Sequence, residues 1–187
     1  MKIFFLSAFI FSMVGLHAQS YSGGSGTSGN PYLIANKADL KYLSEHSGEW
    51  SKHFKQTANI TFTDADFQSG GDFYNGGEGF IPIGNNSTTF TGSYDGDNYS
   101  IDWIYILQSD EDADYLGFFG YCYNGASLSN INLKNIRVTG DKWEWNPMGG
   151  MYRVGSEKVG GLVGWAYNGI TINNCYVSGT VIGYDDV

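Results

Sequence analysis

The sequence predicts an all-β fold in which short strands stack as the coils of a parallel β-helix, a type of solenoid. Glycine is abundant (27 residues), aromatic residues make up 17% of the chain and only 3 prolines occur, a composition that favours strands joined by tight turns. The segment YLGFFGYCYNG at residues 115–125 returns as VGGLVGWAYNG at residues 159–169. A spaced set of three apolar residues returns at the same interval, and two features that share one long interval indicate a repeat architecture.

The first residues predict a secretory signal peptide at residues 1–18. Lys2 precedes an apolar run from Ile3 to Leu16, and the small residue Ala18 follows, which is the pattern of a cleaved leader. The run is shorter than the roughly 20 apolar residues that span a bilayer. We therefore expect a secreted or cell-surface protein whose mature chain is not inserted in a membrane.

Residues 19–30 are rich in glycine and serine, and we expect them to form a flexible segment ahead of an N-terminal cap at residues 31–58. Within the cap, Asn36 is placed to begin a short helix that has Leu40 and Leu43 on one face. This is the only helix that the sequence indicates clearly. We expect it to cover one end of the β structure, where a terminal strand has unpaired backbone groups.

Residues 59–187 contain short apolar segments separated by glycine, asparagine and aspartate, which mark turns. The segments do not alternate simply; instead, three apolar residues recur with two residues and then one residue between them. A straight strand cannot place all three on one face, but a bend between the first and the second can turn all three inward. The sets are Ile101, Ile104 and Ile106; Leu128, Ile131 and Leu133; and Ile172, Cys175 and Val177.

The predicted repeats lie at residues 117–140 and 161–183, 44 positions apart (161 minus 117). An interval of this length could hold about two coils of a parallel β-helix, stacked at roughly 4.8 Å. A β-sandwich and a propeller blade are the alternatives, but neither explains the bent sets of three as simply. In this register Leu133, Ile136 and Val138 correspond to Val177, Thr180 and Ile182.

The net charge of −9 and the pI of about 4.5 argue against nucleic acid as a partner, because no basic run is present to replace the counterions of a phosphate backbone. The two cysteines, Cys122 and Cys175, could pair in an oxidising compartment. Both also lie at apolar repeat positions, where a small buried thiol fits equally well. Pairing of the two therefore stays open.

The glycine motif resembles the GLUG motif repeat of bacterial surface proteins. The second copy, Gly161-Leu162-Val163-Gly164, is followed by INNCYVSGTV at residues 172–181, and Gly117-Phe118-Phe119-Gly120 is similar to it. FIPIG at residues 80–84 and FTGSYDG at residues 90–96 resemble the segment that usually precedes such repeats. The resemblance implies that Gly117, Gly120, Gly161, Leu162 and Gly164 are structural residues of the repeat.

The resemblance implies that the fold is a right-handed parallel β-helix. Such helices are found in secreted adhesin-like proteins of bacteria and in the non-catalytic region of some immunoglobulin A peptidases, and no active site is implied. The coils are expected to continue beyond residue 187, and we expect the sequence to be either the N-terminal part of a longer protein or a truncated reading frame.

No catalytic motif stands out in the sequence. It has no H-E-x-x-H zinc site, no G-x-S-x-G elbow and no carboxylate pair that is better placed than others for glycoside hydrolysis, so we lean away from an enzyme and expect no catalytic residue or cofactor. Asp110, Asp112 and Asp114 have the opening spacing of a calcium loop, but Tyr115 replaces its glycine and Tyr121 its final glutamate. They are weak metal candidates, and a solvated turn is the simpler interpretation.

The insertion between the repeats, DKWEWNPMGGMYRVGSEK at residues 141–158, is the main candidate for a binding segment. Trp143, Trp145 and Tyr152 supply aromatic faces among charged residues, which suits a sugar ring or a protein partner. The alternative is a loop that buries its aromatic residues on the flank of the solenoid. The long loop at residues 63–79 has the same two interpretations, and its aromatic residues are Phe67, Phe73 and Tyr74.

The sequence thus predicts a secreted or cell-surface module that presents loops for adhesion to an extracellular glycan or to a host or matrix protein. One alternative is the non-catalytic stalk of a secreted peptidase similar to the immunoglobulin A peptidases. Others are a polysaccharide-degrading β-helix enzyme and a rigid spacer without a ligand of its own.

Overall fold

The computed structural model describes residues 21–107, 115–145, 147–156 and 158–183. The signal peptide predicted at residues 1–18 and the calcium candidates Asp110, Asp112 and Asp114 lie outside these ranges. The described part of the chain is mostly β, with few and short helices. These are α1 (Lys37–Glu45) and α2 (Asp64–Phe67), with 3₁₀ turns at Ser47–Glu49 and Asn75–Gly77.

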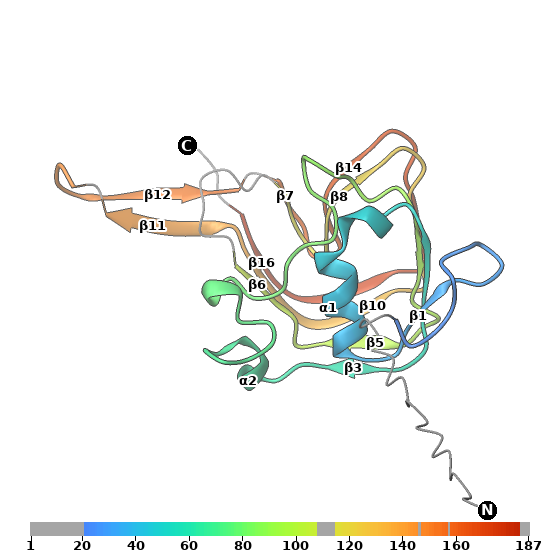
Figure 1. The fold of residues 1–187 in the computed structure, drawn as a ribbon. Helices are drawn as coiled ribbons and strands as arrows, with labels where there is room; N and C mark the ends of the chain where they lie inside the picture. The colour runs from blue at the N-terminus through green and yellow to red at the C-terminus, as the bar shows by residue number, and fades with distance from the viewer. Residues whose placement is uncertain (1–20, 108–114, 146, 157, 184–187) are drawn as a thin grey trace, which may run out of the picture.

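Most strands belong to curved parallel sheets that surround a common core (Figure 1). The first sheet contains, in spatial order, β1 (Tyr32–Ile34), β2 (His53–Gln56), β4 (Ser93–Asp95), β9 (Ser127–Ser129) and β15 (Thr171–Asn173). The second contains β16 (Tyr176–Ile182), β10 (Asn132–Thr139), β5 (Ser100–Asp102) and β3 (Ile60–Thr61), with β6 (Tyr105–Leu107) also paired to β10. Two shorter parallel pairs join β7 (Tyr115–Leu116) to β13 (Lys158–Val159) and β8 (Phe119–Tyr123) to β14 (Val163–Tyr167).

The chain passes through the parallel sheets repeatedly, and we call each pass, which pairs strand by strand with the one before it, a circuit. The two copies of the glycine motif lie on neighbouring circuits. β8, β9 and β10 pair in turn with β14, β15 and β16, so that Ser127 lies beside Thr171, 44 positions later (171 minus 127). An interval of 44 therefore holds one circuit, and the expectation of two coils is wrong. The physical reason is that residues 141–155 leave the circuit as a hairpin and use up the remaining length.

The bent sets of three apolar residues point inward as predicted. In the sets that begin at Ile101 and Leu128, all six side chains are buried. The bend comes from a residue with a left-handed backbone that precedes the second apolar residue, for example Asn130, whose φ is 54°. In the third set Ile172 and Val177 stay exposed, because no described strand lies on the outer side of β15 and β16.

The pairing of β10 with β16 slips by one residue at its bend. Leu133 pairs with Val177 as the sequence predicts, whereas Ile136 pairs with Gly179 and not with Thr180. The slip is possible because Gly179 has a φ of 142° and no side chain to meet the backbone of Ile136. The predicted register is therefore right before the bend and wrong by one residue after it.

Three glycines of the motif lie where other backbone segments pass close by. A Cβ atom on Gly164 would lie 2.7 Å from the backbone nitrogen of Leu116, and Gly117 and Gly120 likewise face backbone atoms. Their φ angles lie outside the left-handed region, so these positions require the absence of a side chain and not a special backbone conformation. Gly161 meets side chains instead.

Leu162 is partly buried against the core, as expected for an inward residue of the motif. Its counterpart in the first copy, Phe118, is fully buried, because a further circuit covers it.

Cys122 and Cys175 are both free thiols. Burial raises the pKa of the Cys122 thiol to about 12.

Helix α1 begins as predicted. The side chain of Asn36 accepts a hydrogen bond from the backbone N–H of Asp39 (3.0 Å), and Leu40 and Leu43 are fully buried. The helix follows β1, the first strand of its sheet, and crosses in front of the curved sheets in Figure 1.

The described part of the segment predicted to be flexible is paired with β1. The N–H of Ser22 donates to the carbonyl of Leu33 (3.2 Å), and the N–H of Leu33 donates to the carbonyl of Gly23 (2.8 Å). Tyr21 is buried and packs against Tyr32 and Phe54. Ser22 and Gly23 thus lie along the outer edge of β1, and residues 25–30 form a turn closed by hydrogen bonds between Ser25, Thr27 and Asn30.

Candidate binding surfaces

The insertion predicted as a binding segment is an antiparallel hairpin that extends away from the circuits (Figure 1). It consists of β11 (Asp141–Trp145) and β12 (Met151–Gly155). Asp141 pairs with Gly155 at its base and Trp145 pairs with Met151 near its tip. A hydrogen bond from the N–H of Ser156 to the carbonyl of Gly140 (2.8 Å) closes the base. The hairpin therefore leaves the stack and returns to it at one point.

The end of the hairpin exposes large apolar side chains. Trp145, Met148 and Met151 are 66%, 96% and 55% exposed. The exposure of Trp145 does not agree with a loop that buries its aromatic residues on the flank of the stack. Trp143 and Tyr152 also belong to the hairpin by backbone pairing, but their side chains lie outside what the structure describes.

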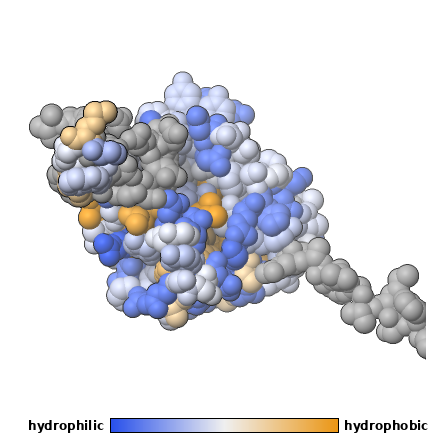
Figure 2. Space-filling model, turned by 60° about the vertical axis from the view of Figure 1, so that its left-hand side comes forward, coloured by the Kyte–Doolittle hydropathy of each residue, from blue (hydrophilic) through white to orange (hydrophobic). Residues whose placement is uncertain are grey.

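A cleft that the sequence did not indicate lies beside α2. One wall is formed by residues 62–68, and the other by the bends that follow β5 and lie within β10. The cleft has a volume of about 660 Å³. Its side chains include Asp64, Phe67, Gln68, Trp103, Tyr105, Asn135 and Arg137. The space-filling view shows a mostly hydrophilic face on this side of the molecule, with hydrophobic residues visible in a hollow near its middle (Figure 2).

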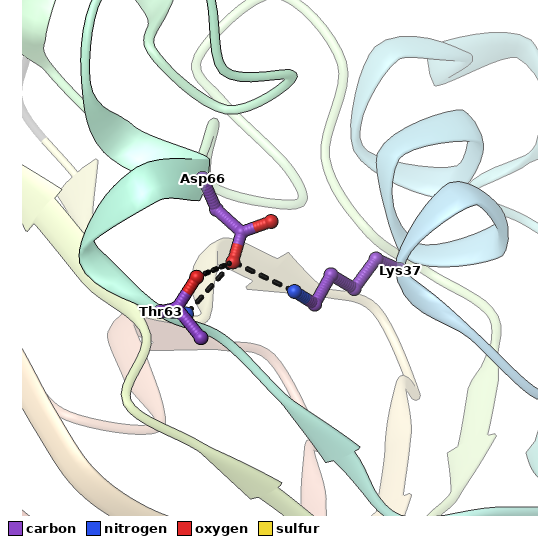
Figure 3. Close-up of polar contacts among 3 residues, drawn as sticks. All are labelled: Lys37, Thr63 and Asp66. Atoms are coloured by element: carbon purple, nitrogen blue, oxygen red, sulfur yellow. Dashed lines mark hydrogen bonds and ion pairs between the residues drawn. The ribbon is translucent and has the colours of Figure 1, made fainter.

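The α2 wall of the cleft is fixed by an acidic residue that binds both its own helix end and α1 (Figure 3). The carboxylate of Asp66 accepts hydrogen bonds from the Nζ of Lys37 (2.7 Å), the N–H of Thr63 (2.7 Å) and the hydroxyl of Thr63 (2.9 Å). Partial burial alone would raise the pKa of Asp66, but these three hydrogen bonds outweigh it, and the pKa is lowered. The ionised form therefore holds α2 against α1.

Asparagine side chains stack along two corners of the circuits. The amide of Asn174 donates to the side-chain oxygens of Asn130 (2.8 Å) and Asn98 (3.2 Å), and that of Asn168 donates to Asn124 (3.2 Å). All five residues have positive φ, which asparagine tolerates better than most residues. The stacks satisfy polar groups within the scaffold, so we assign them a structural role.

The two histidines of the described ranges have structural partners. His46 stacks on the ring of Tyr42 with centroids 3.6 Å apart, and Nδ1 of His53 lies 2.7 Å from the hydroxyl of Ser93. Within the described ranges, no three His, Cys, Asp or Glu residues are grouped so that they could hold a metal ion. In the same part of the chain, no helix has the length and apolar character needed to cross a membrane.

Comparison with known proteins matches a family model to part of the stack. The model described as the GLUG motif matches residues 155–182, which contain Gly161, Leu162 and Gly164 together with β14, β15 and β16. No solved structure matches the chain.

Two relatives extend the comparison beyond the motif. The chain is 37% identical over 117 residues to halomucin of Haloquadratum walsbyi, and this match covers 63% of the chain and 1% of halomucin. It is 31% identical over 137 residues to a protein of Evansella cellulosilytica described as a Gly-rich membrane protein, with 73% of this chain and 15% of that protein covered. The chain thus spans a small part of each relative. With the motif in β14 to β16 and its counterpart on the preceding circuit, the chain is a GLUG-motif-containing protein.

Proposed function

We propose that the chain is a surface-associated, non-enzymatic module whose stacked circuits hold binding segments for adhesion to an extracellular glycan or protein. The GLUG motif and the relative described as a membrane protein support a place at the cell surface. The described part of the chain has a scaffold of buried apolar residues, glycines at close approaches and asparagine stacks. Binding is therefore assigned to the segments that leave the stack.

The exposed end of the hairpin is the observation that carries this proposal. A tryptophan and two methionines in solvent are costly for a soluble chain unless they serve a contact, and such residues are enriched at the centres of protein interfaces. Trp145 supplies a rigid aromatic face, and the flexible thioethers of Met148 and Met151 can adapt to an irregular partner.

We further propose that the curved parallel sheets are the faces of a right-handed parallel β-helix. The common direction and register of β9 with β15 and of β8 with β14 support this interpretation. In such a helix each additional circuit adds another set of corners from which a binding segment can leave.

The adhesion proposal is tested on an array of extracellular glycans and matrix proteins. We compare the wild type with Trp145→Ala/Met151→Ala and with Tyr176→Ala, a control that removes an aromatic residue exposed to a similar extent on β16. We expect the hairpin variant to lose at least tenfold in affinity and the control to bind like the wild type. Absence of binding by the wild type, or equal binding by all three proteins, contradicts the proposal.

A further inference from the structure

Trp103 has an unusual backbone for its residue type. Its φ is 62°, in the left-handed region, and the other eight non-glycine residues of the described chain with positive φ are all asparagine or aspartate. A bulky aromatic residue in this conformation is strained, and such strain is most often kept where a side chain serves a function. The chain bends at Trp103 as it does at the neighbouring position on the next circuit, where Asn135 has a φ of 50°. The bend is therefore a regular feature of the circuits, and only the tryptophan is unusual.

The side chain of Trp103 does not gain burial from this arrangement. It is 59% exposed and lines the cleft beside α2. Further along the same wall, the ring of Tyr105 meets the ring of Phe67 edge to face, with centroids 5.9 Å apart. The cleft of about 660 Å³ falls within the range of small-molecule sites, and an aromatic face on one wall suits the flat apolar side of a sugar ring.

The polar groups around this aromatic wall differ in hydrogen-bonding type. Asp64 can only accept hydrogen bonds and Arg137 can only donate them, while the amides of Gln68 and Asn135 do both. The guanidinium of Arg137 lies 5.6 Å from the ring centroid of Tyr105, and the amide of Asn135 is oriented by a hydrogen bond to Asp102 (2.9 Å). Among the described residues, no ion pair engages Asp64 or Arg137.

This set of groups matches neutral hydroxyls better than a charged ligand. Each sugar hydroxyl both donates and accepts, so neighbouring hydroxyls can use a donor-only and an acceptor-only group together. The single positive and single negative side chains leave the cleft without net charge, although the whole chain carries −9. An anionic sugar would gain from Arg137 and lose to Asp64.

We propose that the cleft beside α2 is a binding site for a neutral saccharide of one or two rings, with a pyranose ring on the indole of Trp103 and hydroxyls at Asp64, Gln68, Asn135 and Arg137. This site extends the proposed surface-binding function to a second surface. It shares no residue with the hairpin, so the two proposals can fail separately.

Isothermal titration calorimetry with neutral disaccharides (cellobiose, maltose and mannobiose) and with glucuronate tests this site. Trp103→Asn is the decisive variant, because asparagine tolerates the left-handed backbone and keeps the corner intact. We expect saturable binding of at least one neutral disaccharide to the wild type, a loss of at least tenfold in Trp103→Asn, and a smaller loss in Asp64→Asn and in Arg137→Gln. Trp145→Ala on the hairpin is the matched control and should bind like the wild type.

Two outcomes overturn this inference. The first is that no neutral disaccharide binds the wild type, whether or not glucuronate does. The second is that Trp103→Asn binds neutral disaccharides as the wild type does. If the hairpin variants still lose their array ligands in either case, the adhesion proposal stands and the cleft site alone is refuted.

Discussion

Replacement of Gly164 by alanine tests whether the motif glycines exist to let circuits approach each other. The added Cβ atom would lie 2.7 Å from the nitrogen and 2.8 Å from the oxygen of Leu116, and 2.8 Å from the oxygen of Lys158. Ordinary contacts begin at 3.4 Å, so three backbone atoms would have to move by about 0.6 Å or more. None of them can escape by a rotamer change, because all belong to the paired strands β7 and β13.

The cost of this substitution can be estimated from two contributions. Overpacking of a tight site costs about 1–3 kcal/mol. Weakening one or two backbone hydrogen bonds, such as that from Gly160 to Leu116 (2.8 Å), adds roughly 1 kcal/mol each. The sum of roughly 2–5 kcal/mol corresponds to a fall in melting temperature of about 5–15 °C for a chain of 187 residues.

Thermal unfolding followed by circular dichroism measures this effect against two matched glycines. A Cβ atom on Gly161 would meet the ends of the Val177 and Ile136 side chains, which can move, so Gly161→Ala should cost less than Gly164→Ala. A Cβ atom added at Gly48 would meet no other atom within 4 Å. The free energy of unfolding of Gly48→Ala should therefore stay within about 0.5 kcal/mol of the wild type. The reasoning is refuted if Gly164→Ala melts within 2 °C of Gly48→Ala, roughly the shift that 0.5–1 kcal/mol produces.

Two further predictions concern ionisable groups. Since the pKa of Asp66 is lowered on folding, its contribution is present above the ordinary value of 3.8 and is lost as the pH falls through the lowered pKa. Asp66→Asn should therefore cost about 1–2 kcal/mol at pH 7 and show a smaller fall in melting temperature between pH 7 and pH 3 than the wild type; equal falls would contradict the role of this carboxylate. Since burial raises the pKa of Cys122 from 9.0 to about 12, its reactive thiolate is about 1,000-fold less populated at pH 8 in the native protein than in urea, and iodoacetamide should modify it more slowly by a factor on that order, as measured by mass spectrometry. Equal rates in the two conditions would show that the circuit around Cys122 is open.

Much of the scaffold could be predicted because its pattern is local. The spacing of Leu128, Ile131 and Leu133 requires a bend whatever surrounds it, and Asn36 with Asp39 defines a helix start within four residues. The length of a circuit could not be predicted from the interval alone, because the hairpin and the circuit share those 44 positions. The one-residue shift in the pairing of β10 with β16 at Gly179 depends on how two segments that are distant in the sequence pair, so it could not be predicted from the spacing within either segment.

The cleft was missed for a similar reason. Phe67, Trp103 and Arg137 are far apart in the sequence. The pairing of β5 and β6 with β10 brings Trp103 and Arg137 to one corner. One signal was available in the sequence. Residues 102–106 and 134–138 have the same apolar spacing, and in that comparison Trp103 occupies the corner position that Asn135 occupies in the next circuit. A tryptophan at an asparagine corner is a feature that sequence comparison of circuits can find.

Removal of the hairpin tests most directly the central claim that the circuits are scaffold and that adhesion belongs to the segments that leave them. Asp141 and Gly155 pair at its base, so residues 142–154 can be replaced by a two-residue Asn-Gly turn. The account predicts a melting temperature within about 3 °C of the wild type, as for a change outside the core, together with loss of binding to the array components other than neutral saccharides. Unchanged binding to those components would contradict it, and so would a protein that no longer folds.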